Sequence, residues 1–93
     1  MSSFTVQLTR VAARDLERLP SPDRDQVGRA LQTLEKYPVG SPPRIKRLKG
    51  FPFPLYRLRS GEYRVLYRVD EALVTVMRVI NRKDLEKTLR RLR

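Results

Sequence analysis

The chain has 93 residues, 40% of them hydrophobic, which is enough for one compact core in a single domain over residues 1–93. It contains no cysteine and no histidine, which excludes disulfides, thiolate chemistry, and the commonest general base and metal ligand. No acidic cluster has the spacing of metal ligands, so we expect neither a metal nor a cofactor. No apolar run approaches the roughly 20 residues that span a membrane, and the N-terminus has no signal pattern, so we expect a cytoplasmic protein without a membrane partner.

The net charge is +11, and nearly all of the excess lies in the second half of the chain. Residues 1–40 hold six Lys/Arg against five Asp/Glu, whereas residues 41–93 hold fifteen against five. Such a field favours polyanions: nucleic acid, an acidic lipid surface or an acidic protein segment. The alternative is plain solubility, but a net charge of about 2–8 suffices for that in a small domain. The excess therefore favours a polyanionic partner.

The first part of the chain predicts one strand and two helices. Residues 4–8 alternate apolar and polar side chains, as in a half-buried strand. Thr9 is suited to cap a helix that runs to about Leu19. A second helix follows with Ser21 as its N-cap and ends before Pro38. The apolar positions of the second helix have helical spacing: Val27, Ala30, Leu31 and Leu34. The two helices should form an antiparallel pair packed on a sheet.

The second part of the chain predicts a long loop, three strands and a helix. Prolines and glycines interrupt residues 38–54, which we expect to be a loop. This loop carries four basic residues: Arg44, Lys46, Arg47 and Lys49. Strands are expected at residues 55–59, 63–69 and 73–80, and a final helix begins near Arg82. The sequence therefore predicts an α+β fold: a small antiparallel sheet in the order β-α-α-β-β-β-α, with a helical hairpin packed on one face.

The strand arginines are predicted to share one face of the sheet. Side chains alternate along a strand, so the apolar residues of strand 63–69 should pack under the helices while Arg64, Leu66 and Arg68 face away. The same alternation puts Arg57 and Arg59 on one side of the preceding strand. If the faces coincide, one surface carries Arg57, Arg59, Arg64 and Arg68, with Arg78 and Arg82 beside it. Like charges this close oppose folding, whereas guanidiniums bind phosphate oxygens in bidentate fashion, so a phosphate site is favoured over a solvated sheet face.

Two motifs of this chain follow one another, the loop Leu48–Gly50 and the hairpin Tyr56–Tyr67. The hairpin is Tyr-Arg-Leu-Arg-Ser-Gly-Glu-Tyr-Arg-Val-Leu-Tyr. Together they resemble the signature of the RelE/ParE superfamily of type II toxins, a Leu-Lys/Arg-Gly loop before a Tyr-Arg-X-Arg-X-Gly-X-Tyr-Arg-X-X-Tyr hairpin. The resemblance extends from about Phe4 to Leu89 and is more specific for the superfamily than for one branch.

The RelE branch, which we favour, implies an endoribonuclease that cuts mRNA in the ribosomal A site and thereby inhibits translation. It also implies a cognate acidic antitoxin as partner. In that branch hairpin arginines, an arginine after the last strand and a C-terminal tyrosine carry the reaction. The arginines correspond here to Arg57, Arg59, Arg64 and Arg82. Residues 81–93 contain no tyrosine, which favours the alternative, a ParE-like inhibitor of DNA gyrase without catalysis of its own. A third possibility is a pure binding module.

The RelE-like reaction is attack of a ribose 2′-OH on the adjacent phosphate, and it needs a proton acceptor, charge stabilisation and protonation of the leaving oxygen. We expect Arg64 and Arg82 to stabilise the phosphate and Arg57 and Arg59 to position it. Five further residues are expected to bind RNA: Lys46, Arg47, Lys49, Arg68 and Arg78.

The proton acceptor is the open part of this mechanism. Arginine stays protonated in proteins, so the acceptor must be Glu62, Glu86, a tyrosine elsewhere or the ribosome. Glu86 is the preferred choice, with a surface ion pair to Arg82 or Arg90 as its alternative role. Near it, Leu85, Leu89 and Leu92 are expected to close the core, although an antitoxin helix could also cover them.

Overall fold

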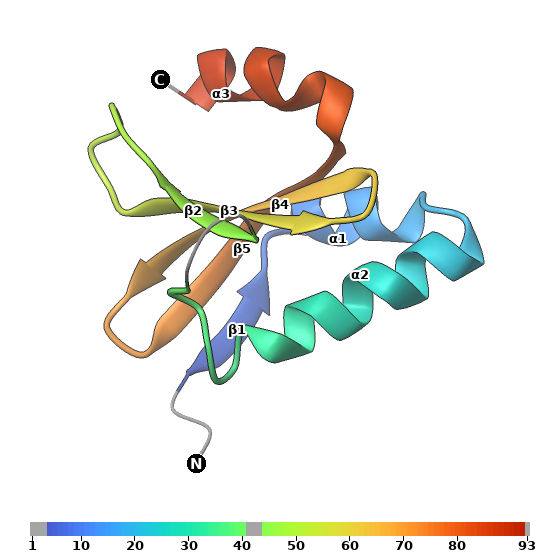
Figure 1. Ribbon diagram of the computed structural model, residues 1–93, viewed down its shortest axis with the longest axis horizontal. Helices are drawn as coiled ribbons and strands as arrows, with labels where there is room; N and C mark the ends of the chain where they lie inside the picture. Colours follow the sequence, from blue (N-terminus) through green and yellow to red (C-terminus); the bar gives the residue numbers. More distant parts are fainter. Residues whose placement is uncertain (1–3, 41–43, 93) are drawn as a thin grey trace.

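The computed structural model of the chain describes residues 4–40 and 44–92. Its elements are β1 (Thr5–Leu8), α1 (Arg10–Glu17), α2 (Ser21–Thr33), β2 (Ile45–Leu48), β3 (Leu55–Ser60), β4 (Tyr63–Asp70), β5 (Leu73–Asn81), the 3₁₀ turn η1 (Arg82–Asp84) and α3 (Leu85–Leu92). The strands form one sheet, with α1 and α2 on one side and α3 on the other (Figure 1). The predicted α+β class, with a helical hairpin on one sheet face, is confirmed. None of the described helices is long and apolar enough to cross a membrane.

The sheet has the strand order β1-β5-β4-β3-β2 and is mixed rather than purely antiparallel. The pairs β2–β3, β3–β4 and β4–β5 are antiparallel, as in a meander of consecutive strands. β1 runs parallel to β5, with Thr5 opposite Leu73 and Leu8 opposite Val76. The alternation within β1 predicts a strand but carries no information on its partner or direction, which explains this difference from the expected antiparallel sheet.

The expected loop over residues 38–54 contains a strand, so the loop prediction is wrong over β2. Four residues without proline or glycine pair with β3, and Lys46 lies opposite Arg57. Ile45 is buried in the core beneath the helices, whereas Lys46 and Arg47 are exposed. β2 is a short edge strand, and charged side chains of this kind discourage pairing with another chain. The strand brings basic residues of the supposed loop onto the sheet.

The helix pair covers the larger core. Thr9 caps α1 as predicted, since its Oγ1 accepts a hydrogen bond from the Ala12 N–H at 3.1 Å. α2 begins at Ser21 with Pro20 at the N-cap position, one residue earlier than predicted. The apolar face of β4 lies under the helices as predicted, with Val65 and Tyr67 fully buried. Helices and sheet contribute a common set of buried residues, including Val27, Leu31, Leu34, Leu58, Val74 and Val76.

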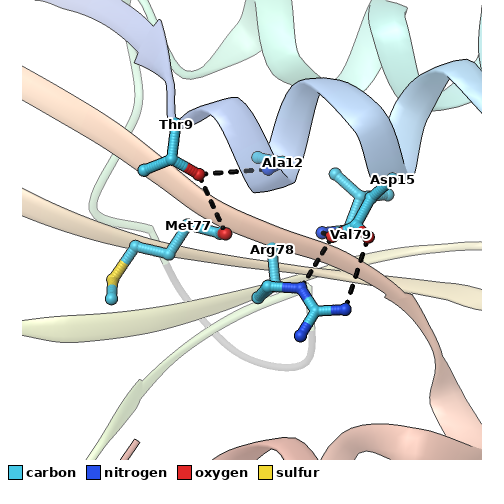
Figure 2. A network of polar contacts seen from close by, with 6 residues as sticks. All are labelled: Thr9, Ala12, Asp15, Met77, Arg78 and Val79. Atoms are coloured by element: carbon cyan, nitrogen blue, oxygen red, sulfur yellow. Dashed lines mark hydrogen bonds and ion pairs between the residues drawn. The ribbon is translucent and has the colours of Figure 1, made fainter.

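Thr9, the N-cap of α1, and Asp15 of α1 continue the pairing of β5 beyond the end of β1 (Figure 2). The Thr9 N–H donates to the Val76 carbonyl at 2.9 Å, and its Oγ1–H donates to the Met77 carbonyl at 3.1 Å. The Asp15 carboxylate accepts a hydrogen bond from the Val79 N–H at 3.0 Å. These contacts satisfy backbone groups that an edge strand would otherwise leave without a protein partner, and they fix α1 along β5.

The second sheet face carries a smaller core under α3. Leu55, Leu66, Ile80 and Leu89 are buried together, and Leu85 and Leu92 pack beside them. The expectation that the leucines of the final helix close the core is therefore confirmed. The arginine-bearing face of the sheet is consequently divided: one part is covered by α3, and the other carries charged side chains.

Candidate functional site

Four arginines converge at one end of the second sheet face. Arg59 and Arg64 are direct cross-strand neighbours on β3 and β4, and Arg57 lies two residues further along β3. Ile80 is the β5 neighbour of Arg64, and Arg82 follows two residues later at the start of η1. We call Arg57, Arg59, Arg64 and Arg82 the arginine cluster. It joins the end of the β3–β4 hairpin to the end of β5.

The pKa values of two cluster members are lowered, partly because the other arginines of the cluster lie close to them. The pKa of Arg57 is lowered by burial, then by the positive charges of Arg64 and Arg59. The pKa of Arg64 is lowered by burial, then by Arg59 and Arg82. Both groups remain protonated at neutral pH because arginine is too strongly basic to lose its proton in proteins. The arrangement concentrates positive charge at some cost to folding, and a bound anion would relieve the repulsion.

The turn between β3 and β4 holds two cluster members in place. Gly61 adopts a positive φ of 58°, a conformation that glycine tolerates without strain. Arg64 Nη1 donates to the Gly61 carbonyl at 3.0 Å and to the Tyr63 carbonyl at 2.9 Å. Arg82 Nε lies 3.1 Å from Glu62 Oε1, and the Arg82 N–H donates to the Glu62 carbonyl at 2.9 Å. The turn therefore orients the guanidinium of Arg64 on β4 and that of Arg82 at the start of η1.

The same hairpin is fastened to α2 on its other side. The Tyr63 hydroxyl donates to Asp23 Oδ2 at 2.9 Å, and this hydrogen bond, together with burial, raises the pKa of Tyr63. A Cβ on Gly61 would approach the side-chain amide of Gln26 to about 3.1 Å, so the turn lies directly against α2. The arginines of the cluster that belong to the β3–β4 hairpin are therefore carried by an element that is fixed to α2, and not by a mobile loop.

Two of the predicted RNA-binding arginines lie in ion pairs away from this cluster. Arg68 Nε binds Asp70 Oδ2 at 2.7 Å, which raises the pKa of Arg68 and lowers that of Asp70. The Arg68 guanidinium also lies 4.8 Å from the centre of the Phe53 ring. Arg78 Nε binds Asp15 Oδ2 at 2.8 Å, as part of the network that fixes α1 to β5 (Figure 2). The structure therefore gives both arginines structural partners.

The other predicted residues line a hollow of about 410 Å³ between β2 and α3. Its lining includes Lys46, Arg47, Lys49 and Glu86. Because Lys46 is the cross-strand neighbour of Arg57, this hollow adjoins the arginine cluster. Arg82 forms its ion pair with Glu62 rather than with Glu86. Within residues 4–40 and 44–92, no three Asp or Glu residues are grouped so that they could hold a metal ion.

The positioning roles of Glu62 and Asp15 could not be identified from the sequence. The sequence suggests Glu62 only as a proton acceptor, and nothing in its sequence surroundings reveals that η1 returns to the hairpin turn. Asp15 lies on a helix far from Arg78 in the chain, and no local spacing links the two. Both contacts depend on tertiary structure.

Comparisons with known proteins agree with this architecture. Residues 6–86 match the family model described as ParE toxin of type II toxin-antitoxin system, parDE. Toxin RelG of Mycobacterium tuberculosis is 37% identical over 87 residues, which cover 88% of this chain and 94% of that protein. The chain belongs to the RelE/ParE superfamily of type II toxins.

Two solved structures extend the likeness to the fold. The toxin-antitoxin complex RelBE2 from M. tuberculosis superposes with a TM-score of 0.74 at 31% identity, covering 86% of this chain and 99% of that one. The archaeal RelE-RelB complex from Pyrococcus horikoshii gives a TM-score of 0.72 at 26% identity, covering 86% of this chain and 96% of that one. The first is a toxin-antitoxin complex, and the second is a complex of RelE with RelB.

Proposed function

We propose that this toxin is a ribosome-dependent endoribonuclease that cleaves mRNA by attack of a ribose 2′-OH on the adjacent phosphate. The observation that carries the proposal is the convergence of Arg57, Arg59, Arg64 and Arg82 at one end of the sheet. The pentacoordinate phosphate of this reaction gains negative charge, and fixed guanidiniums near it lower the barrier without reorganisation. The overall likeness to RelG and to the toxin of RelBE2 supports the same branch.

The arginines divide into two roles in this proposal. Arg64 and Arg82 stabilise the transition state, because the hairpin turn fixes both guanidiniums. Removing one such donor typically reduces the rate by about 10²–10³. Arg57 and Arg59 hold the phosphate in position, and the half-buried Arg57 contributes the stronger field because it is less screened by water.

Glu86 is the proton acceptor in the proposal. Its carboxylate lines the hollow that adjoins Arg57 through Lys46, so an RNA strand crossing from the cluster into this hollow would pass both groups. Lys46, Arg47 and Lys49 would hold the backbone of that strand. The carboxylate of Glu62, by contrast, is engaged by the Arg82 guanidinium.

An acidic antitoxin is the proposed regulatory partner. The related RelBE2 structure is a toxin-antitoxin complex, and the arginine cluster and the β2–α3 hollow of this chain present positive charges that an acidic partner could neutralise. Acidic residues of a partner that cover these groups would exclude RNA from the same surface and would also speed the encounter.

A ParE-like gyrase inhibitor is the second candidate. Two observations favour it: the matching family model is described as a ParE toxin, and residues 81–93 contain no tyrosine. In that case the arginine cluster would bind a protein surface and would perform no chemistry.

One paired experiment separates the two candidates. Purified protein is added to programmed ribosomes with mapping of mRNA ends, and in parallel to a gyrase supercoiling reaction. We expect mRNA cleavage that Arg64→Ala reduces at least 100-fold, and no inhibition of supercoiling. Arg68→Ala is the matched control, since it removes the same charge from the same sheet face and should retain cleavage. Intact mRNA with blocked supercoiling would reject the nuclease in favour of the second candidate.

A further inference from the structure

A second basic hollow lies on the helix side of the sheet, between α2 and β3. It has a volume of about 350 Å³, at the lower end of the size range of small-ligand sites. Its lining includes Gln26, Arg29 and Thr33 of α2, Arg44 from the segment before β2, and Arg59 and Gly61 of the β3–β4 hairpin. We call it the α2–β3 groove. Of the arginine cluster and the predicted RNA-binding residues, Arg59 alone is among its described lining residues.

Arg29 and Arg44 line this groove beside the backbone of Arg59, whose side chain belongs to the arginine cluster on the opposite sheet face. The Arg59 N–H donates to the Arg44 carbonyl at 2.9 Å, so the backbones of these two residues are held side by side. Arg29 and Arg44 are exposed, and neither forms an ion pair with a residue in the described part of the chain. No acidic side chain is among the described residues that line the groove. The groove therefore has uncompensated positive charge.

The groove and the arginine cluster lie on opposite faces of the sheet and share the residue Arg59. Arg59 belongs to both, because it lowers the pKa of Arg57 and Arg64 and also lines the groove. A chain molecule whose phosphate is held at the cluster could therefore place a neighbouring phosphate in the groove around the end of the hairpin. Such a repeated, closely spaced anion is a property of a polynucleotide backbone.

The lining favours a phosphate over an acidic peptide helix. Helical peptides bind grooves through apolar anchor side chains. The apolar contribution here comes from Ala30 and from Leu58, which is only 1% exposed, so no anchor pocket is present among the described lining residues. The side chains of Gln26 and Thr33 add hydrogen-bonding groups, which suit phosphate and ribose oxygens.

We propose that the α2–β3 groove binds the phosphate of an RNA nucleotide flanking the one held at the arginine cluster, through Arg29 and Arg44. This inference rests on the proposed RNA substrate but not on cleavage. It extends the RNA contact surface from the hairpin to α2.

The test measures binding of single-stranded RNA oligonucleotides that cannot be cleaved because every 2′-OH is methylated. A hexanucleotide and a trinucleotide are titrated into the wild type, into R29A/R44A and into R10A/R14A at several salt concentrations. The last variant is the matched control, because it removes two exposed arginines from α1 and leaves the same net charge. Circular dichroism and thermal unfolding verify that the variants fold.

We expect R29A/R44A to weaken binding of the hexanucleotide by at least about tenfold, since each substitution removes a charged hydrogen bond. The slope of its salt dependence should flatten by about 0.7 for each phosphate that the variant no longer binds. The trinucleotide and the R10A/R14A control should change less than about twofold, the scale of a shared field rather than a specific contact. In NMR titrations of the wild type, the Gly61 backbone amide and the Gln26 side-chain amide should shift on addition of the hexanucleotide.

Several results would overturn the inference: equal losses of affinity in both double variants, no hexanucleotide binding by the wild type, or unshifted Gly61 and Gln26 amides. Binding of a polyglutamate peptide that depends on Arg29 and Arg44, without RNA binding, would assign the groove to a protein partner. Groove-dependent RNA binding by a protein that leaves ribosome-bound mRNA intact would instead reject the proposed nuclease activity and retain the groove.

Discussion

The carboxylate of Glu62 lies 3.1 Å from the guanidinium of Arg82, and the two residues are also joined by a backbone hydrogen bond of 2.9 Å. Both side chains are more than half exposed, so the ion pair itself contributes little to stability. The pair matters for geometry, because it holds Arg82, which follows β5, against the turn between β3 and β4. In the proposed reaction Glu62 acts as a positioning residue through Arg82.

Glu62→Gln tests this role by separating affinity from rate. The substitution removes a negative charge beside the cluster, so RNA affinity should stay the same or rise by no more than about fivefold, the scale of an exposed ion pair. The single-turnover cleavage rate should fall, because Arg82 is no longer held toward the phosphate. Glu86→Gln, which removes the proposed proton acceptor, should lower the rate as well, with any rise in RNA affinity again no more than about fivefold. A Glu62→Gln protein with an unchanged cleavage rate would refute the positioning role.

Asp15 is expected to contribute to stability through the edge of β5. Its carboxylate accepts the Val79 N–H and binds Arg78, and its side chain is only 11% exposed. Asp15→Ala should lower the free energy of unfolding by about 1–3 kcal/mol, the range for a buried donor left without its partner. Asp15→Asn keeps an oxygen acceptor for Val79 and should cost less. Urea unfolding of both variants measures the difference, and equal destabilisation would contradict the role assigned to the Val79 hydrogen bond.

Tyr67 should make stability depend on pH in the alkaline range. Its hydroxyl is buried and donates to the Pro38 carbonyl at 2.7 Å. Burial, followed by the nearby Tyr56, raises the pKa of Tyr67 above its ordinary value of 10.0. Below pH 10 the hydroxyl is neutral in both the folded and unfolded states, so its contribution is fully present. Above pH 10 the unfolded state ionises first, and the free energy of unfolding should fall by up to about 1.4 kcal/mol per pH unit.

The corresponding variant is Tyr67→Phe, which removes the titrating group. We expect it to be less stable than the wild type at pH 8, by about 1–3 kcal/mol for the unsatisfied Pro38 carbonyl. It should also lose less stability between pH 10 and pH 11. Tyr37→Phe is the control, because Tyr37 is 67% exposed and its substitution should change neither quantity. Parallel pH profiles for the wild type and Tyr67→Phe in urea unfolding would contradict this account.

The spacing of apolar residues within single strands and helices predicted which side chains are buried. The two-residue period of β3 and β4 assigned Tyr67 to the core and Arg64 to the opposite face, because neighbouring side chains of a strand point to opposite sides. The helical spacing of α2 identified Val27 and Leu31 as buried. These assignments follow from backbone geometry within one element, and they needed no knowledge of the partner elements.

The spacing of residues within one element could not predict contacts between segments that lie far apart in the chain. The prolines around β2 predict a loop, whereas this four-residue edge strand is stabilised by its ladder with β3. Arg68 and Arg78 look equivalent to Arg64 in sequence, but Asp70 and Asp15 engage them in ion pairs. The sharing of Arg59 between the cluster and the α2–β3 groove likewise depends on how α2 packs on the hairpin.

The amino-acid sequence alone determined the class of fold, the side of each strand that enters the core and the excess of positive charge in the second half, because these properties depend on composition and on the periods of single elements. Tertiary structure decided which arginines meet and which are bound by carboxylates. The reason is that contact energies between residues such as Glu62 and Arg82 fall steeply with distance, and that distance is set only when the whole sheet has formed.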